Sequence, residues 1–233
     1  MEIEAVIFDL DGVIVHTDHN HYLAWRRLCA EEGIPFDEEL NDKLRGVSRM
    51  ACMDIIMEKA ARAYSPEEKM ELAERKNGYY RQSLYELTER DVPRDVKDVL
   101  LRLKRMSLKL AIGSSSRNAA FIVERLGLEG LFDVIVDGNA ISYSKPHPEV
   151  FLQAAERLGV QPSRCLVVED AAAGVEAAIS GGMKVAAIGS AAMNDSAAVP
   201  GSAAANDSVS AIVKPDYRLH RLGDMLMLPG LIR

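Results

Sequence analysis

Short apolar runs alternate with helical patterns along most of this chain, and this alternation limits its possible folds more than any other feature. Residues 3–8 (IEAVIF) have the pattern of a strand buried on both faces. Further strand patterns follow later in the chain, at residues 108–113, 133–136, 165–170 and 184–188. Helical patterns separate them: from Pro93 to Met106, over 118–126, after Pro148 and from about Ala172. The alternation predicts a Rossmann-like α/β fold, in which crossover helices connect a parallel sheet that includes the first strand.

A different pattern interrupts the α/β part near its start. From residue 18 to 87 the sequence is charged, and its apolar residues recur at the three-to-four spacing of helices. A chain of 233 residues can form one sizeable core and a smaller inserted unit. We therefore expect residues 1–15 and 88–233 to form the α/β core, and residues 16–87 to form a small helical cap domain. Residues 190–208, rich in Ala, Ser and Asn, are expected to form a surface loop.

Composition restricts the partners and the compartment. The chain has 28 basic and 35 acidic side chains and a net charge of −7, so we expect it to bind neither nucleic acid nor anionic lipid. The three cysteines, Cys29, Cys52 and Cys165, are widely spaced without a metal-ligand pattern, which is typical of reduced thiols in the cytoplasm. The first residues lack a secretory pattern, and no apolar run is long enough to span a bilayer. We expect a cytoplasmic monomer.

Polar side chains stand where the predicted strands end. Asp9 and Asp11 occupy alternate positions at the end of the first strand, and Gly12 permits a tight turn after them. The later strands are followed by Ser114, by Lys145 and by the pair Glu169 and Asp170. Ligands of open parallel sheets bind outside the carboxyl ends of the strands. Because Mg²⁺ prefers carboxylate and carbonyl oxygens, the sequence predicts a Mg²⁺ site made of Asp9, the backbone carbonyl of Asp11, Glu169 and Asp170.

The same residues predict phosphoryl transfer. A carboxylate repels a phosphate unless a metal ion and a fixed ammonium, here Lys145, neutralise the charge. Asp9 then attacks and forms an aspartyl-phosphate, while Ser114 donates to the transferring oxygens and Asp11 moves protons. Each residue taken singly also has a structural interpretation, because Asp, Ser and Glu at strand ends cap helices and turns, and a lysine is often solvated.

The order of these motifs resembles the haloacid dehalogenase superfamily. That superfamily has DLDG, here residues 9–12, then a serine after a second strand, then Lys-Pro, here Lys145 and Pro146, then an acidic pair. The resemblance extends over the whole chain and includes the helical insertion, which is similar to the family's cap. It implies an aspartate nucleophile and Mg²⁺-dependent phosphoryl transfer. Dehalogenation needs neither a metal nor a second acid, so Asp11 disfavours that reaction.

Part of the insertion is similar to the cap of the β-phosphoglucomutases. The similar cap residues are His21, Trp25, Gly46, Val47, Ser48, Arg49 and Lys76. In the core, Ser116, Arg117 and Asn118 resemble the loop with which those enzymes hold a second phosphate, and Arg49 is expected to join it. The resemblance implies interconversion of β-D-glucose 1-phosphate and D-glucose 6-phosphate through an aspartyl-phosphate and β-glucose 1,6-bisphosphate. It also implies that His21 and Lys76 couple the position of Asp11 to cap closure.

Some positions depart from that pattern. His16 stands where these enzymes usually have Asp, and Arg45 and Arg117 stand where lysines are frequent, which retains the charge. Ser115 replaces a small apolar residue and is expected to add hydrogen bonding near the transferring phosphate, as a substrate-binding residue.

Several alternatives stay open at this point. His21 and Lys76 also suit ordinary surface positions, and Trp25 suits core packing. The runner-up function is a sugar-phosphate phosphatase of the same superfamily, which shares the core motifs and differs mainly in its cap. A function of another class is a regulator that binds a sugar phosphate without turnover. The intact set of catalytic groups disfavours it: Asp9, Asp11, Lys145 and Asp170.

Overall fold

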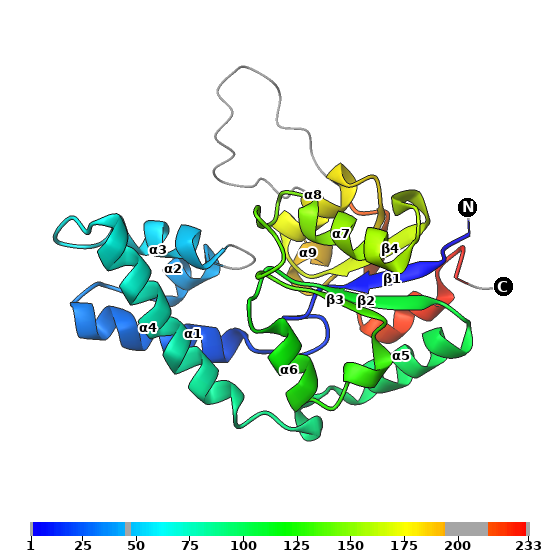
Figure 1. Ribbon diagram of the computed structural model, residues 1–233, viewed down its shortest axis with the longest axis horizontal. Helices are drawn as coiled ribbons and strands as arrows, with labels where there is room; N and C mark the ends of the chain where they lie inside the picture. The colour runs from blue at the N-terminus through cyan, green and yellow to red at the C-terminus, as the bar shows by residue number, and fades with distance from the viewer. Residues whose placement is uncertain (1, 45–47, 194–213, 232–233) are drawn as a thin grey trace, which may run out of the picture.

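The structure is a computed structural model, and it describes residues 2–44, 48–193 and 214–231. An α/β core carries both chain termini at one end, and a group of four helices, the cap, lies at the opposite end (Figure 1). The cap follows directly on the first strand of the core. The DLDG turn therefore stands at the junction of the two parts.

Six parallel strands form the sheet of the core, in the order β3-β2-β1-β4-β5-β6. The strands are β1 Ala5–Phe8, β2 Lys109–Gly113, β3 Val134–Val136, β4 Cys165–Glu169, β5 Lys184–Ile188 and β6 Tyr217–Leu219. The chain adds β2 and β3 on one side of β1 and then crosses to add β4 on the other. Phe8 pairs with both Ile112 and Val168, so the carboxyl ends of β1, β2 and β4 are level. This confirms the predicted parallel α/β fold, and in folds of this class ligands bind where the strand order reverses, here beside β1.

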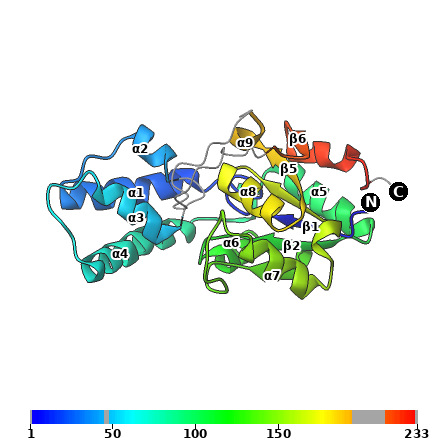
Figure 2. The same cartoon turned by 90° about the horizontal axis from the view of Figure 1, so that it is seen from above.

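Helices cover both faces of the sheet (Figure 2). The core helices are α5 Arg94–Arg105, α6 Ala119–Arg125, α7 Glu149–Leu158, α8 Ala172–Ser180 and α9 Gly189–Met193. Short 3₁₀ helices occur at η1 Glu89–Asp91, η2 Glu129–Leu131, η3 Pro162–Arg164 and η4 Leu222–Met227. Successive strand residues face opposite sides, so Phe8 packs with Leu100 on one face while Ile7 packs with Phe151 on the other. Burial of each such side chain stabilises the fold by about 1.5–3 kcal/mol.

The cap consists of four helices with a hydrophobic core of their own. They are α1 Asp18–Glu32, α2 Glu38–Asp42, α3 Arg49–Met57 and α4 Pro66–Leu84. Trp25, Met53 and Ile56 lie at the centre of this core. Near the end of α4, Tyr80 and Leu84 pack into the core of the α/β part instead, so α4 connects the two hydrophobic clusters. The division of the chain into residues 16–87 and the remainder stays a prediction.

The C-terminal region contains elements that were not predicted. The expected loop at residues 190–208 is wrong for residues 190–193, which belong to α9, and residues 194–208 lie outside the described part of the chain. Strand β6 was missed because only three residues pair with β5 and its sequence lacks an apolar run. None of the described helices is long and apolar enough to cross a lipid bilayer.

Candidate active site

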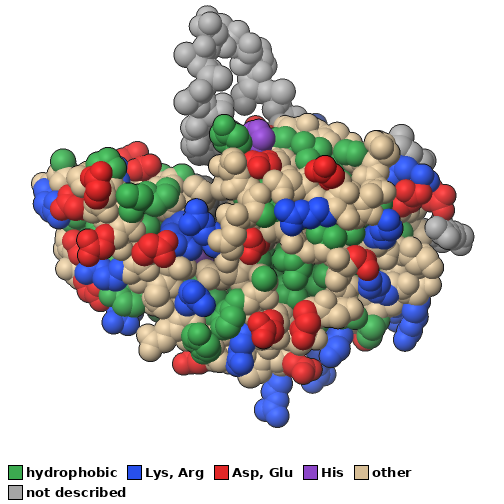
Figure 3. Space-filling model, viewed as in Figure 1, with side chains coloured by type: hydrophobic (Ala, Val, Ile, Leu, Met, Phe, Trp, Pro, Cys, Tyr) green, Lys and Arg blue, Asp and Glu red, His purple; other side chains and the backbone are tan. Residues whose placement is uncertain are grey.

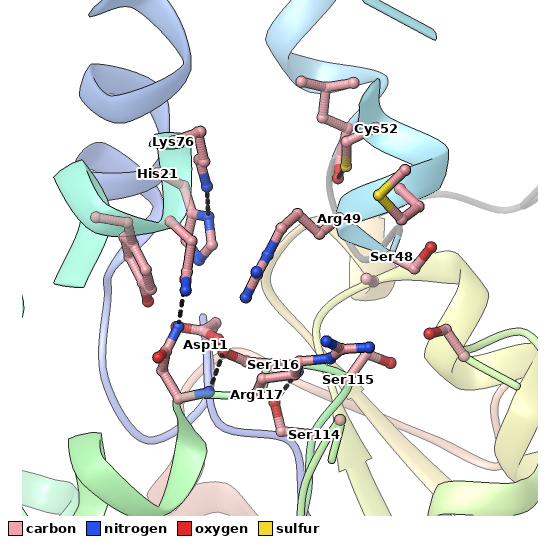
Figure 4. Close-up of a pocket in the computed structure, with 18 of the residues that line it drawn as sticks. Asp11, His21, Ser48, Arg49, Cys52, Lys76, Ser114, Ser115, Ser116 and Arg117 are labelled. Atoms are coloured by element: carbon pink, nitrogen blue, oxygen red, sulfur yellow. Dashed lines mark hydrogen bonds between the residues drawn. The ribbon is translucent and has the colours of Figure 1, made fainter. Parts of the chain in front are cut away.

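A cavity of about 530 Å³ lies between the cap and the core. The ends of β1, β2 and β4 form its floor, and α1, α3 and α4 of the cap form its roof (Figure 4). Almost every predicted site residue in the described part of the chain lines it: Asp9, Asp11, His21, Trp25, Ser48, Arg49, Lys76, Ser114, Ser115, Ser116, Arg117, Asn118, Glu169 and Asp170. Lys145 contacts two of these residues directly. Gly46 and Val47, also predicted, lie outside the described residues.

Three acidic side chains meet at the floor of the cavity. Asp9, Glu169 and Asp170 each offer a carboxylate oxygen, and these oxygens lie within 4.8 Å of one another. Burial raises the pKa of Asp170, and repulsion from Glu169 and Asp9 raises it further. A divalent cation among these oxygens would offset that repulsion, and oxygen-only ligands are the set that Mg²⁺ prefers. The residues present therefore fit the predicted metal ion.

Gly12 shapes the turn after β1 so that this acidic cluster can form. Its backbone has φ +87°, a left-handed conformation that side chains disfavour. A Cβ atom at this position would overlap the carboxylate of Asp170. The DLDG turn can approach the acidic pair after β4 only because its last residue has no side chain.

Lys145 joins two of the carboxylates. Its Nζ lies 2.5 Å from Asp9 Oδ1 and 2.8 Å from Glu169 Oε2, and all three residues are buried. Burial alone would lower the pKa of Lys145, but the two carboxylates outweigh this effect and raise it. The lysine therefore keeps its positive charge beside Asp9. The alternative that Lys145 is a solvated surface residue is wrong.

Asp11 has hydroxyl groups around its carboxylate, whereas Asp9 is bonded to the ammonium of Lys145. Its carboxylate accepts a hydrogen bond from the hydroxyl of Thr17, and that hydroxyl accepts one from Tyr80 at 3.2 Å. Burial raises the pKa of Asp11 to about 7, repulsion from Asp9 adds to this, and the bond from Thr17 opposes it. A carboxyl group with this pKa can both donate and accept a proton near neutral pH. The side chain of Asp11 is thus suited to acid–base chemistry, whereas that of Asp9, beside Lys145, is suited to nucleophilic attack on a phosphate.

The loop between β2 and α6 presents hydroxyl groups and backbone amides. Ser114 Oγ accepts from the backbone N–H of Ser116 at 3.1 Å, and Ser116 Oγ accepts from that of Asn118 at 3.2 Å (Figure 4). Both hydroxyls are thereby oriented, and each keeps a hydrogen that it can donate to a ligand. Ser115 Oγ is buried and has no hydrogen-bond partner among the described residues. Its expected contact with phosphate stays a prediction.

His21 and Lys76 form a contact in the roof of the cavity (Figure 4). Lys76 Nζ lies 2.8 Å from His21 Nδ1 and 4.5 Å from the ring centre of Trp25, and the lysine is 3% exposed. Burial lowers the pKa of Lys76 to about 7. Burial and the neighbouring Lys76 also hold the pKa of His21 well below its usual value, so the imidazole stays neutral. Both residues are cavity residues rather than ordinary surface residues, and Trp25 serves the cap core as well.

Replacement of Lys76 by Met should stabilise the protein, most strongly below about pH 7. Between pH 7 and the ordinary lysine pKa of 10.5, the folded chain binds fewer protons than the unfolded chain, so the free energy of unfolding rises with pH. The variant lacks this penalty, and its gain should be on the order of a few kcal/mol at pH 6. Urea unfolding at pH 6 and pH 10 measures it.

The exposed Lys59 provides the matched control for that experiment. Lys59→Met should change neither the stability nor its dependence on pH. For each protein, the unfolding free energies at pH 6 and pH 10 are subtracted. If this difference is as large in Lys76→Met as in the unaltered protein, the pKa of Lys76 is not lowered by burial and the prediction is wrong.

Arg49 reaches into the cavity from the first turn of α3 (Figure 4). The preceding Ser48 caps this helix, because its hydroxyl accepts from the backbone N–H of Ala51. On the core side, Arg117 lines the same cavity. Figure 3 shows basic side chains gathered at the junction between the cap, at the left, and the core. The far end of the cavity therefore carries positive charge that can hold an anion.

Several residues of the site were not found by sequence reasoning. Thr17 and Tyr80 support Asp11, and Glu74 contacts Arg49. Tyr80 lies far along the chain from Asp11, and only the packing of α4 against α1 brings the two together. Thr17 lies only six residues after Asp11, just before the first cap helix. This position in the sequence could have indicated that its hydroxyl contacts Asp11.

Comparison with known proteins adds the following findings. The model of the haloacid dehalogenase-like hydrolase family matches residues 3–182. Beta-phosphoglucomutase of Bacillus subtilis is 40% identical over 189 residues, which cover 80% of this chain and 84% of that protein. A phosphorylated carbohydrates phosphatase of Thermotoga maritima is 34% identical over 226 residues, covering 96% and 100%. The crystal structure of beta-phosphoglucomutase from Clostridium difficile has a TM-score of 0.76 at 41% identity, covering 80% and 85%.

Proposed function

This chain belongs to the haloacid dehalogenase-like hydrolase family, and we propose that it is a Mg²⁺-dependent β-phosphoglucomutase. The reaction interconverts β-D-glucose 1-phosphate and D-glucose 6-phosphate through β-glucose 1,6-bisphosphate. One observation carries the proposal: the cavity has the acidic cluster and Lys145 at its floor and, apart from them, two arginines, Arg49 of the cap and Arg117 of the core. A mutase needs two phosphate sites at once, and the similarity to the mutases of B. subtilis and C. difficile supports this assignment.

In this proposal Asp9, Glu169, Asp170 and the backbone carbonyl of Asp11 hold Mg²⁺. The bound ion supplies positive charge to the transferring phosphate and orients its oxygens. Lys145 holds Asp9 in place, and its ammonium also attracts the phosphate. Ser114 and the adjacent backbone amides donate to the same phosphate.

The chemistry consists of two transfers. With Asp9 phosphorylated, Asp11 takes the proton of the sugar 6-hydroxyl as that oxygen attacks the phosphorus, and the bond between phosphorus and Asp9 breaks. The bisphosphate then turns around. A carboxylate oxygen of Asp9 attacks the phosphate on C1, the P–O bond to the sugar breaks, and Asp11 returns the proton to the leaving oxygen. The pKa of Asp11, about 7, allows it to act in both directions.

The cap residues supply positioning and exclude water. Tyr80 of α4 is linked to Asp11 through Thr17, and Lys76 and His21 lie in the roof above them. We infer that closure of the cap seats these residues and Asp11 together, so that the sugar hydroxyl, rather than water, receives the phosphoryl group.

Incubation of the purified protein with β-glucose 1-phosphate and Mg²⁺ tests the proposal. Glucose 6-phosphate and free phosphate are followed together, with and without β-glucose 1,6-bisphosphate. We expect glucose 6-phosphate to form, faster with the bisphosphate, and little free phosphate. The phosphatase of T. maritima, similar over nearly the whole chain, makes a sugar-phosphate phosphatase the second candidate. Release of phosphate as fast as any isomerisation would establish that function instead.

A further inference from the structure

Arg49, which the proposed function assigns to the far phosphate, already has an anionic partner. Its Nη1 lies 2.5 Å from Glu74 Oε1, across the gap between α3 and α4. Both residues line the cavity. The guanidinium is therefore bound to a carboxylate in the same way in which it would bind a phosphate, through donation from its N–H groups to anionic oxygens.

The side chains of Arg49 and Glu74 differ in their exposure to solvent. The Arg49 side chain is 19% exposed, whereas that of Glu74 is 64% exposed. Burial lowers the pKa of Arg49, Glu74 opposes this, and the nearby Arg117 adds to the lowering. An anion that arrives between the arginines thus meets a largely buried cation and an exposed carboxylate, and the exposed carboxylate has room to turn into solvent when the anion takes its place.

Glu74 is also connected to the core side of the far site. Its Oε2 accepts from Asn77 Nδ2 at 3.5 Å, and Asn77 Oδ1 accepts from Asn118 Nδ2 at 3.0 Å. This path joins Arg49 of the cap to Asn118 of the core through two residues of α4. Arg49 and Asn118, two of the groups proposed to bind the far phosphate, are thus both hydrogen-bonded to side chains of α4.

We propose that Glu74 is a specificity-determining residue that competes with the far phosphate of the ligand for Arg49. This inference rests on the proposed function. A phosphate dianion offers more charge than one carboxylate and can displace Glu74, whereas a neutral hydroxyl cannot. The same competition assists release, since the carboxylate returns to Arg49 as the phosphate leaves. Such release is required when the bisphosphate turns around between the two transfers.

Calorimetric titration of Glu74→Gln with β-glucose 1,6-bisphosphate tests this proposal, in the presence of Mg²⁺ and in the Asp9→Asn background to suppress turnover. Glutamine keeps the size of the side chain and removes its charge. We expect the bisphosphate to bind about threefold to tenfold more tightly, and glucose 6-phosphate, which can use the site at the cavity floor, to gain less. Steady-state assays of Glu74→Gln alone should show that both KM and kcat fall, because release slows.

The control is Glu71→Gln, which makes the same change of charge on an exposed residue of α4 outside the cavity. Equal bisphosphate affinity in the two variants, or weaker binding by Glu74→Gln, would overturn the proposal. A structural role alone would lower stability without tightening binding. If the chain proves to be a phosphatase, it releases free phosphate from the bisphosphate when Asp9 is intact, and the calorimetric comparison still decides the role of Glu74.

Discussion

Asp9→Asn is expected to reduce turnover by about 10⁴-fold or more while leaving the fold intact. An amide cannot act as the nucleophile that accepts the phosphoryl group, and the other carboxylate bonded to Lys145, that of Glu169, is assigned to the metal site. The asparagine occupies the same volume, and the loss of one negative charge reduces the crowding with Glu169 and Asp170. The melting temperature should therefore change by only a few degrees.

Two measurements check this expectation together. A coupled assay follows glucose 6-phosphate, and intact mass spectrometry after incubation with the bisphosphate detects the mass of an added phosphoryl group. The unaltered protein should show the added mass, and Asp9→Asn should not. Asp98→Asn, an exposed site on α5, is the control and should behave as the unaltered protein does. Turnover by Asp9→Asn at the unaltered rate would refute covalent catalysis at this residue.

Lys145→Met should affect both activity and stability. The substitution leaves Asp9 and Glu169 buried side by side without their shared cation, and loss of one partner from a buried ion pair costs about 3–5 kcal/mol. Turnover should fall by about 10³-fold, because the nucleophile loses its orientation and the phosphate loses an ammonium. Urea unfolding and the coupled assay measure the two effects.

The stability loss in Lys145→Met should depend on pH in a defined direction. Burial already raises the pKa of Glu169, and removal of the ammonium raises it further, so this carboxyl can take up a proton as the pH falls. A protonated, neutral Glu169 carboxyl can be buried without a cation beside it at a much smaller cost in free energy. We therefore expect the difference in unfolding free energy between variant and unaltered protein to be large at pH 8 and small at pH 5.

A surface ion pair provides the comparison for Lys145→Met. Lys69 lies 2.7 Å from Asp54, whose side chain is exposed, and Lys69→Met should cost less than about 1 kcal/mol. If Lys145→Met is as stable and as active as Lys69→Met at pH 8, the lysine has neither of the roles assigned to it here.

The strands and helices that line the site could be predicted because their patterns are local. β1 and β4 are continuous apolar runs, and each is followed by acidic residues at its carboxyl end. β6 could not be predicted in this way, because its three residues become a strand only by pairing with β5. The helix at Gly189–Met193 was missed for a similar reason, since its Ala- and Ser-rich sequence also suits a loop.

The chemistry-bearing residues of the site were also evident from sequence, because catalysis needs particular functional groups. Asp9, Ser114, Lys145 and the acidic pair follow strands whose ends a parallel sheet must bring to one edge. Their meeting is therefore a consequence of the fold class, and the distances from Lys145 to Asp9 and Glu169 agree with it.

The sequence by itself thus determined the parallel α/β core, the acidic floor of the site and the position of Lys145 beside it. The physical reason is that the topology of a parallel sheet brings the carboxyl ends of its strands to one edge. Only the tertiary structure decided how the cap residues contact that floor and one another. The link from Tyr80 through Thr17 to Asp11, the burial of Lys76 against His21 and the pairing of Glu74 with Arg49 all depend on how helices pack side by side. Helix packing is set by the shapes of many side chains at once, and no single position in the sequence records it.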